Sequence, residues 1–156
     1  MDRKLFGIYL NDHLAGSVVG SRLVRRIVKH NEGNHYGSEA ARLAEEIEQD
    51  KETLESLMDR LGVRKKKTRL AIATVGETLG RLKPNGRLIG YSPLSRVVEL
   101  EGLTIGIAGK LELWQSLKAT GEQVDGIDAD QLIQRAESQR DRAADLRLRA
   151  AREAFS

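Results

Sequence analysis

Residues 94–117, LSRVVELEGLTIGIAGKLELWQSL, decide the fold. At helical spacing they form two neighbouring apolar rows, which are Leu94, Val97, Thr104, Ala108 and Leu111 and, beside them, Leu100, Leu103, Ile107, Trp114 and Leu117. A helix that is apolar over so much of its circumference has to be contacted by several other elements, so we expect it to be central in a small all-helical domain. Ser92 and Pro93 are suited to begin this helix, and Gly121 lies just past its end.

Two pairs of glycines, each one helical turn apart, occur in this helix and in the first helix of the chain. They are Gly102 with Gly106 and Gly16 with Gly20. Each glycine lowers helix stability by roughly 1 kcal/mol relative to alanine, so a compensating contact is needed. We expect the two helices to approach each other closely at these positions, or, should the glycines face outward, to contact another copy of the chain.

The composition favours a charged, helical protein. Of the 156 residues, 31% are charged and 4% are aromatic, which favours long, salt-bridged helices over sheets. There is no cysteine, so disulfides, thiolate metal sites and cysteine nucleophiles are excluded. The length indicates a single domain, residues 1–156. Neither a cleavable signal sequence nor an apolar run of about 20 residues is present, so we expect a cytoplasmic protein.

Apolar periodicity and capping residues predict four long helices, at about 3–30, 39–61, 93–118 and 129–155, and a short one at 69–82. Asp2, Ser38 and Asp128 are the expected N-caps of the first, second and last helix. Two hairpins with short loops and a long connection between them favour an all-α, up-down-down-up four-helix bundle, with the short helix in the crossover. The alternative is a plain up-and-down bundle in which the connector packs as a fifth helix.

Related acidic motifs occur in the second and fourth long helices. Residues 46–50, EIEQD, and 137–141, ESQRD, share the pattern Glu-x-x-(Gln/Arg)-Asp. Through these motifs and its predicted helix order, the chain resembles the ferritin-like superfamily, which includes bacterioferritins and rubrerythrins. Its members hold two metal ions in the bundle middle, with glutamates from two helices and Glu-x-x-His from the other two. The resemblance implies a ferritin-like fold with degenerate metal motifs, because Gln49 and Arg140 stand where the histidines would be.

No metal or other cofactor is expected, because glutamine is a poor ligand and Arg140 places a fixed positive charge where a cation would bind. Iron or manganese is the alternative. Its candidate ligands are Asp12, His13, Glu46, Asp50, Glu101 and Glu137. Asp12, Asp50 and Glu101 fall within apolar rows, but Asp12 and Asp50 differ in height by roughly 9 Å and are not expected to share one ion. An alternative set of residues lies closer to a single height along the bundle axis: Asp12, His13, Glu55, Glu101, Asp141 and Asp145.

Carboxylates that point into the bundle need compensation, because burying an unpaired charge is costly. We therefore expect them to pair with arginine, at Arg22, Arg26 or Arg140. His13 is the one histidine placed to be a ligand or an acid-base group. No nucleophile-base-acid constellation is recognisable, so no catalytic residue is predicted.

A basic run, RKKKTR, follows the second helix. Between residues 62 and 96 there are nine Lys or Arg and one Glu, a net charge of +8, so the rest of the chain carries +3 minus +8, or −5. The candidate anion-binding residues are Arg64, Lys65, Lys66, Lys67 and Arg69. Nucleic acid phosphates, an anionic membrane or the acidic face of another copy are possible partners of residues 64–69; a solvated loop is the alternative.

The first functional hypothesis is a non-catalytic structural or interaction protein, homodimeric, without the usual di-iron site. The second is a carboxylate-rich, metal-binding oxidoreductase or storage protein. The third is a module that binds nucleic acid or an anionic membrane through the basic crossover. No small-molecule substrate is identifiable from the sequence.

Overall fold

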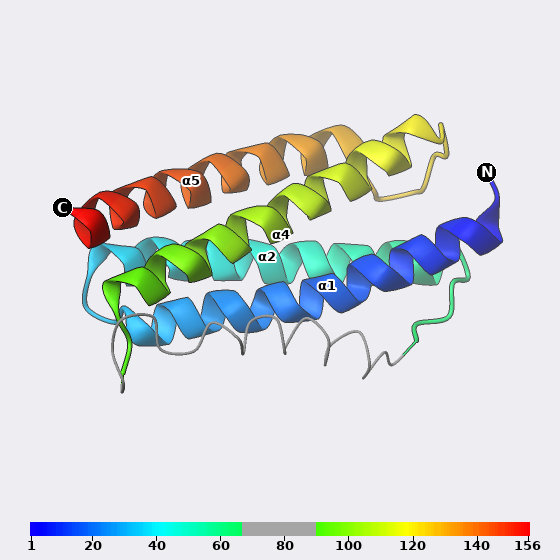
Figure 1. Ribbon diagram of the computed structural model, residues 1–156. Helices are drawn as coiled ribbons and strands as arrows, with labels where there is room; N and C mark the ends of the chain where they lie inside the picture. Colours follow the sequence, from blue (N-terminus) through cyan, green and yellow to red (C-terminus); the bar gives the residue numbers. More distant parts are fainter. Residues whose placement is uncertain (67–89) are drawn as a thin grey trace.

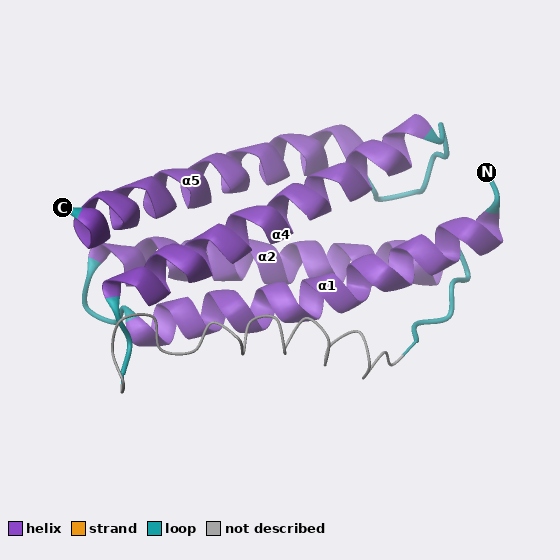
Figure 2. Cartoon of the chain, viewed as in Figure 1, coloured by secondary structure: helices purple, strands orange, loops and turns teal. Residues whose placement is uncertain are grey.

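The computed structural model describes residues 1–66 and 90–156, and this part of the chain forms four long α-helices and no strand (Figure 1, Figure 2). The helices are α1 (Arg3–His30), α2 (His35–Arg60), α4 (Pro93–Ala119) and α5 (Ala129–Phe155). The predicted all-α fold with four long helices is confirmed. The short helix predicted at 69–82 lies outside the described residues.

The four helices form two antiparallel hairpins that pack side by side. α1 pairs with α2 and α4 with α5, while α1 also contacts α4 and α2 contacts α5. In Figure 1, α1 and α5 run in one direction and α2 and α4 in the other. Ion pairs agree with this arrangement: Arg3 contacts Glu122 of the α4–α5 loop at one end, and Arg96 contacts Glu153 near the chain end at the other.

Three helices begin where their capping residues predict. The Asp2 carboxylate accepts hydrogen bonds from the backbone N–H groups of residues 4 and 5. Ser92 and Ser95 form a reciprocal capping box at the start of α4, and the Asp128 carboxylate accepts from Gln131 N at the start of α5. These bonds satisfy N–H groups that have no partner within the helix, which fixes the first residue of each.

The predicted start of α2 is wrong by four residues. Asn34, rather than Ser38, caps this helix, because its side-chain oxygen accepts from Tyr36 N and Gly37 N. The early start buries Tyr36, which is 2% exposed. It also brings Gly37 against the preceding loop, where an added Cβ would lie 2.1 Å from Asn31 O. Only glycine fits there.

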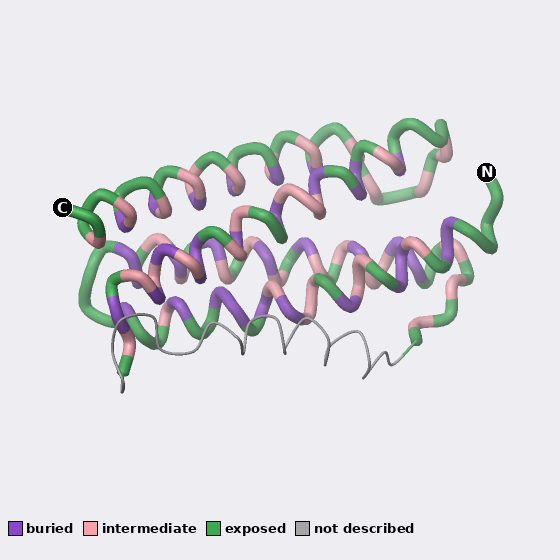
Figure 3. Tube along the Cα trace, viewed as in Figure 1, coloured by how far each residue is buried: buried purple, intermediate pink, exposed green. Residues whose placement is uncertain are grey.

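Apolar side chains from all four helices fill the interior in two clusters, one towards each end of the bundle (Figure 3). One cluster contains Leu43 and Leu100, and the other contains Leu57 and Trp114, all fully buried. No helix within residues 1–66 and 90–156 has the length and apolar content needed to cross a bilayer. The stability of the bundle therefore comes mainly from these two clusters.

We expect Leu100→Ala to lower the free energy of unfolding by about 3 kcal/mol, because it removes a fully buried side chain and leaves a cavity. Leu148→Ala is the matched control, since Leu148 is 44% exposed on α5, and it should change the free energy by less than about 0.5 kcal/mol. Urea unfolding followed by circular dichroism measures both. Equal effects of the two substitutions would contradict the burial assigned to α4.

Candidate functional site

Asp50 of α2 lies in the middle of the bundle and is 3% exposed. Its Oδ2 accepts hydrogen bonds from Lys110 Nζ of α4 at 2.5 Å and from Gln139 Nε2 of α5 at 3.0 Å. Its Oδ1 forms an ion pair with Arg135 of α5, and the side-chain oxygen of Gln139 accepts a second bond from Lys110. We refer to these four side chains as the polar layer. They join three of the four helices through one buried carboxylate.

The polar layer separates the two apolar clusters. On each helix that contributes to it, the last residue of one cluster and the first residue of the other lie within about one helical turn of the polar residue. These flanking residues are Ile47 and Leu54 on α2, Ile107 and Leu111 on α4, and Ala136 and Ala143 on α5. The same helical spacing that buries the apolar side chains therefore buries Asp50 and Gln139, and it leaves only 16% of the Lys110 side chain exposed.

Glu46 extends the polar layer by one helical turn along α2. Its carboxylate accepts a bond from Arg142 of α5 at 2.5 Å. Burial raises the pKa of Glu46, but the hydrogen bonds from Arg142 and Gln139 and the charges of Arg142 and Lys110 outweigh burial and leave the pKa below its ordinary value. Burial also lowers the pKa of Lys110, although the neighbouring Asp50 carboxylate raises it. With Asp50 and Glu46 negative and Lys110, Arg135 and Arg142 positive, these five groups carry a net charge of +1.

Two of the candidate metal ligands, Asp50 and Glu46, are thus paired with basic side chains. His13 is half-buried on α1. The other candidates are exposed, namely Asp12, Glu101 and Glu137. The six residues therefore lie in three different environments: two are in ion pairs, one is half-buried and three are exposed.

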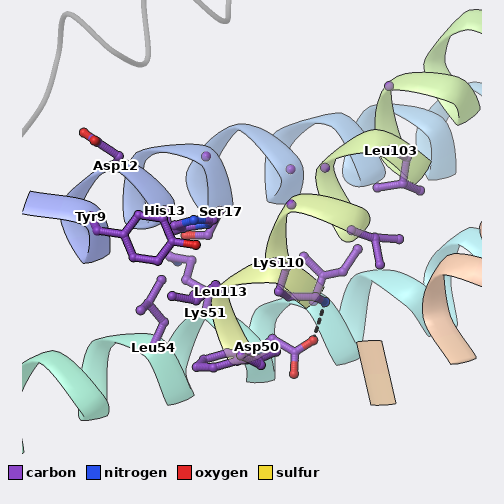
Figure 4. Close-up of a pocket in the computed structure, with 18 residues that line it drawn as sticks. Tyr9, Asp12, His13, Ser17, Asp50, Lys51, Leu54, Leu103, Lys110 and Leu113 are labelled. Carbon is purple, nitrogen blue, oxygen red and sulfur yellow. Dashed lines mark hydrogen bonds and ion pairs between the residues drawn. The ribbon is translucent and has the colours of Figure 1, made fainter. Parts of the chain in front are cut away.

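Asp12 and Glu101 fall within apolar rows of the sequence but do not lie inside the bundle. Both are exposed, and Figure 4 shows the Asp12 carboxylate pointing away from Asp50 and Lys110. The carboxylate that α4 places inside the bundle is Glu99, which is 2% exposed. Since α4 contacts both α1 and α5, residues that face either neighbour are buried, and Glu101 lies on the side that faces neither.

The alternative cluster near one level is not formed either. It comprises Asp12, His13, Glu55, Glu101, Asp141 and Asp145. Within the described ranges, 1–66 and 90–156, no three His, Asp or Glu side chains lie close enough to share an ion. Asp141 pairs instead with Arg140 on the surface, at 3.0 Å.

A second polar network, which was not predicted from the sequence, joins α4 to the α1–α2 loop. Arg26 Nε lies 2.6 Å from Glu99 Oε1, and the Tyr91 hydroxyl donates to Glu99 Oε2 at 2.9 Å. That hydroxyl accepts from Asn31 Nδ2, and Asn31 Oδ1 accepts from Arg96 Nε at 2.7 Å. Burial raises the pKa of Glu99, although the bond from Tyr91 and the charge of Arg26 lower it. Arg26 is therefore confirmed as a partner of an inward carboxylate.

The helical spacing of the sequence indicates that Glu99 is buried. Glu99 lies one helical turn before Leu103 and continues the buried row of Leu103 and Ile107, and Lys110 continues the same row at its other end. Of the other arginines predicted to pair with inward carboxylates, Arg22 is exposed and Arg140 pairs with an exposed aspartate.

The start of the basic run is held against α1 by one buried asparagine. Asn11 Oδ1 accepts from Lys66 N at 2.7 Å, and Asn11 Nδ2 donates to Arg64 O at 3.2 Å. Asn11 Nδ2 also donates to Gly7 O of its own helix. These bonds set the direction in which the chain leaves α2.

Part of the basic charge is compensated locally. Lys65 Nζ lies 2.9 Å from Asp59 Oδ2 and 3.9 Å from Glu55 Oε2. Lys67 and Arg69 lie outside the described residues. Anion binding through residues 64–69 therefore stays a prediction.

A cavity of about 410 Å³ lies beside the polar layer, between α1, α2 and α4 (Figure 4). Its wall combines apolar side chains with glycines, among them Gly16, Gly20, Gly106 and Gly109. A Cβ added at any of these four would meet no described heavy atom within 4 Å. The close helix approach predicted at the glycines is therefore wrong for Gly16, Gly20 and Gly106, where α1 and α4 leave a space; Gly102 also lines the cavity.

The polar rim of the cavity on α1 is formed by Tyr9, His13 and Ser17 (Figure 4). The His13 ring packs edge-on against Tyr9, with 4.5 Å between ring centroids. Burial lowers the pKa of His13, although the adjacent Asp12 charge raises it, so the neutral form of the ring is favoured. The Tyr9 and Ser116 hydroxyls are hydrogen-bonded at 3.2 Å.

We expect Asp50→Asn to lower the free energy of unfolding by about 3 kcal/mol, because it removes the one carboxylate shared by Lys110 and Arg135 and leaves both cations uncompensated. Asp141→Asn makes the same chemical change at an exposed pair and should cost less than about 0.5 kcal/mol. Urea unfolding at neutral pH measures the difference. A cost at Asp50 as small as that at Asp141 would show that the polar layer is not a buried unit.

The raised pKa of Glu99 predicts a pH dependence of stability. Above the ordinary pKa of 4.5, the folded chain binds more protons at Glu99 than the unfolded chain does. The contribution of Glu99 to the free energy of unfolding is therefore fully present below pH 4.5 and is lost as pH rises through the pKa of the folded state. Glu99→Gln removes this titration. The free energy of unfolding of wild type minus that of the variant should fall as pH rises above 4.5, by at most about 1.4 kcal/mol per unit. Urea unfolding at several pH values tests this, and a constant difference would contradict it.

Comparisons with known proteins gave no match. No protein-family model, no curated protein and no solved structure matches this chain. The function is therefore argued from the arrangement of its own residues.

Proposed function

We propose that this chain is a ferritin-like helical bundle with a non-catalytic, structural or binding role, in which ion pairs stand where that superfamily holds two metal ions. The observation that carries the proposal is Asp50, a buried carboxylate in the bundle middle with Lys110 and Arg135 against its two oxygens. The up-down-down-up order of the superfamily agrees with the directions of α1, α2, α4 and α5, which supports the likeness.

The charges of the polar layer oppose a divalent cation. Two unit charges 4 Å apart interact by roughly 4 kcal/mol at the effective dielectric constant of a protein surface, so a divalent ion at that distance would be repelled by roughly 8 kcal/mol per cation. Both Asp50 oxygens are already occupied, by Lys110 and Gln139 on one side and Arg135 on the other. An ion would have to displace at least one of these buried partners.

The same contacts suit a structural role. A buried carboxylate with three partners on two other helices disfavours any register of α2, α4 and α5 that leaves it unpaired. Glu46 and Arg142 add a second pair on the same side of the bundle. The middle of the bundle is thus built to specify one arrangement of helices.

Metal content tests the proposal. After anaerobic incubation with ferrous or manganous salt and removal of free ions, elemental analysis of the wild type should find well below one equivalent per chain, because the cations occupy the site. Asp50→Asn, which leaves the layer more positive, should also retain none.

Two equivalents per chain, lost in Asp50→Asn and retained in the surface control Asp141→Asn, would overturn the proposal. That outcome would instead establish the carboxylate-rich oxidoreductase or storage protein as the function.

A further inference from the structure

We propose that the cavity between α1, α2 and α4 is a binding site for a small, uncharged, largely apolar molecule. The inference goes beyond the structural role proposed above and does not depend on the metal content of the bundle. It rests on the cavity itself, on the glycines in its wall and on the state of the charged groups around it (Figure 4).

Four glycines of the cavity wall, Gly16, Gly20, Gly106 and Gly109, have neither a positive φ nor a close contact with described atoms. Positive φ angles occur at other glycines, in loops, and not at Gly16, Gly20, Gly106 or Gly109. None of these four is needed for a close contact with described atoms, because an added Cβ would find open space. Each therefore lowers helix stability without a compensating contact inside the described chain. The consequence of all four together is an open cavity.

The cavity has the size and lining of a small-molecule site. Its volume of about 410 Å³ lies within the range of roughly 300 to 1,000 Å³ typical of ligand pockets. It is roughly two to three times the size of an apolar cavity that takes up one benzene. Apolar side chains cover its α2 and α4 sides, which include Ile47, Leu54, Leu103, Ile107 and Leu113.

The charged groups on the cavity wall indicate an uncharged ligand. Lys110 is paired with Asp50, and Lys51 with Glu48 at 2.6 Å. A charged ligand would lose water without gaining a free counter-ion on this wall, which is costly. Asp12 is exposed and points outward.

Two side chains of the cavity wall carry hydrogen-bonding groups without a partner among the described residues: Trp114, whose Nε1 is buried, and His13. Burial favours the neutral form of the His13 ring, which is half-buried and, within the described residues, not hydrogen-bonded to another side chain. It can accept or donate one bond at the α1 rim.

The test uses the uncharged fluorescent probe N-phenyl-1-naphthylamine and the full chain. Its emission should rise saturably with a stoichiometry of one per chain. The anionic analogue 8-anilinonaphthalene-1-sulfonate has a similar ring system and should bind at least tenfold more weakly, because its sulfonate has no free cation to pair with. Since Trp114 is the only tryptophan and lines the cavity, its indole N–H resonance should shift when the neutral probe binds.

Two variants fill the cavity from opposite walls, Gly20→Leu on α1 and Gly109→Leu on α4. Both should weaken probe binding at least tenfold. Both should also keep the helical circular dichroism signal and have a melting temperature equal to or above that of the wild type, because leucine favours the helix and enters open space. The matched control is Gln115→Leu, which adds the same side chain at an exposed position of α4 away from the cavity, and it should bind the probe as the wild type does.

Absence of saturable binding to the wild type would overturn the proposal. So would equal binding by folded Gly20→Leu or Gly109→Leu, or equal affinity for the anionic probe. If one of the two variants fails to fold, the other and the Trp114 resonance decide. A metal-binding result would not affect any of these outcomes.

Discussion

The compensation of the Asp50 carboxylate is the interaction on which the middle of this bundle depends. A carboxylate that is almost fully buried is tolerated only when its oxygens are paired. Lys110, Gln139 and Arg135 provide that pairing from two other helices, so the relative heights of α2, α4 and α5 are tied to one residue. The apolar clusters on either side supply the free energy of folding, while the polar layer selects one register among several that would bury similar apolar area.

α1 is the helix that does not contribute to the polar layer, and its contacts differ accordingly. At the level where the other helices are polar, α1 carries Gly16, Ser17 and Gly20 and borders the cavity. It joins both apolar clusters, through Phe6 and Leu10 in one and Leu23 and Ile27 in the other, and Ala15 and Val19 near its middle are also buried. α1 is thus packed at its ends and in its middle, and the cavity lies along the face that carries Gly16, Ser17 and Gly20.

The Glu99 network, like the polar layer, compensates a buried carboxylate with basic and hydrogen-bonding side chains, but it lies near one end of the bundle. It surrounds a buried carboxylate with Arg26 and Tyr91 and connects the start of α4 to the loop between α1 and α2 through Asn31. Burial dominates the pKa of Glu99, so its charge is held less firmly than that of Glu46, whose hydrogen bonds outweigh burial. The two inward carboxylates thus respond to pH in opposite directions although each has an arginine partner.

The sequence by itself determined the four helices, because capping residues and apolar spacing act within one or two turns of the chain. It placed Asp2, Ser92 and Asp128 correctly as caps and put Asp50 among buried residues, but it assigned the cap of α2 to Ser38 instead of Asn34. Only the tertiary structure decided which bases meet the inward acids, which acids of the apolar rows are exposed, and that the glycines line a cavity. Those outcomes depend on the rotation and separation of neighbouring helices. A change of a few ångströms there alters every side-chain contact while leaving the helical pattern of the sequence unchanged.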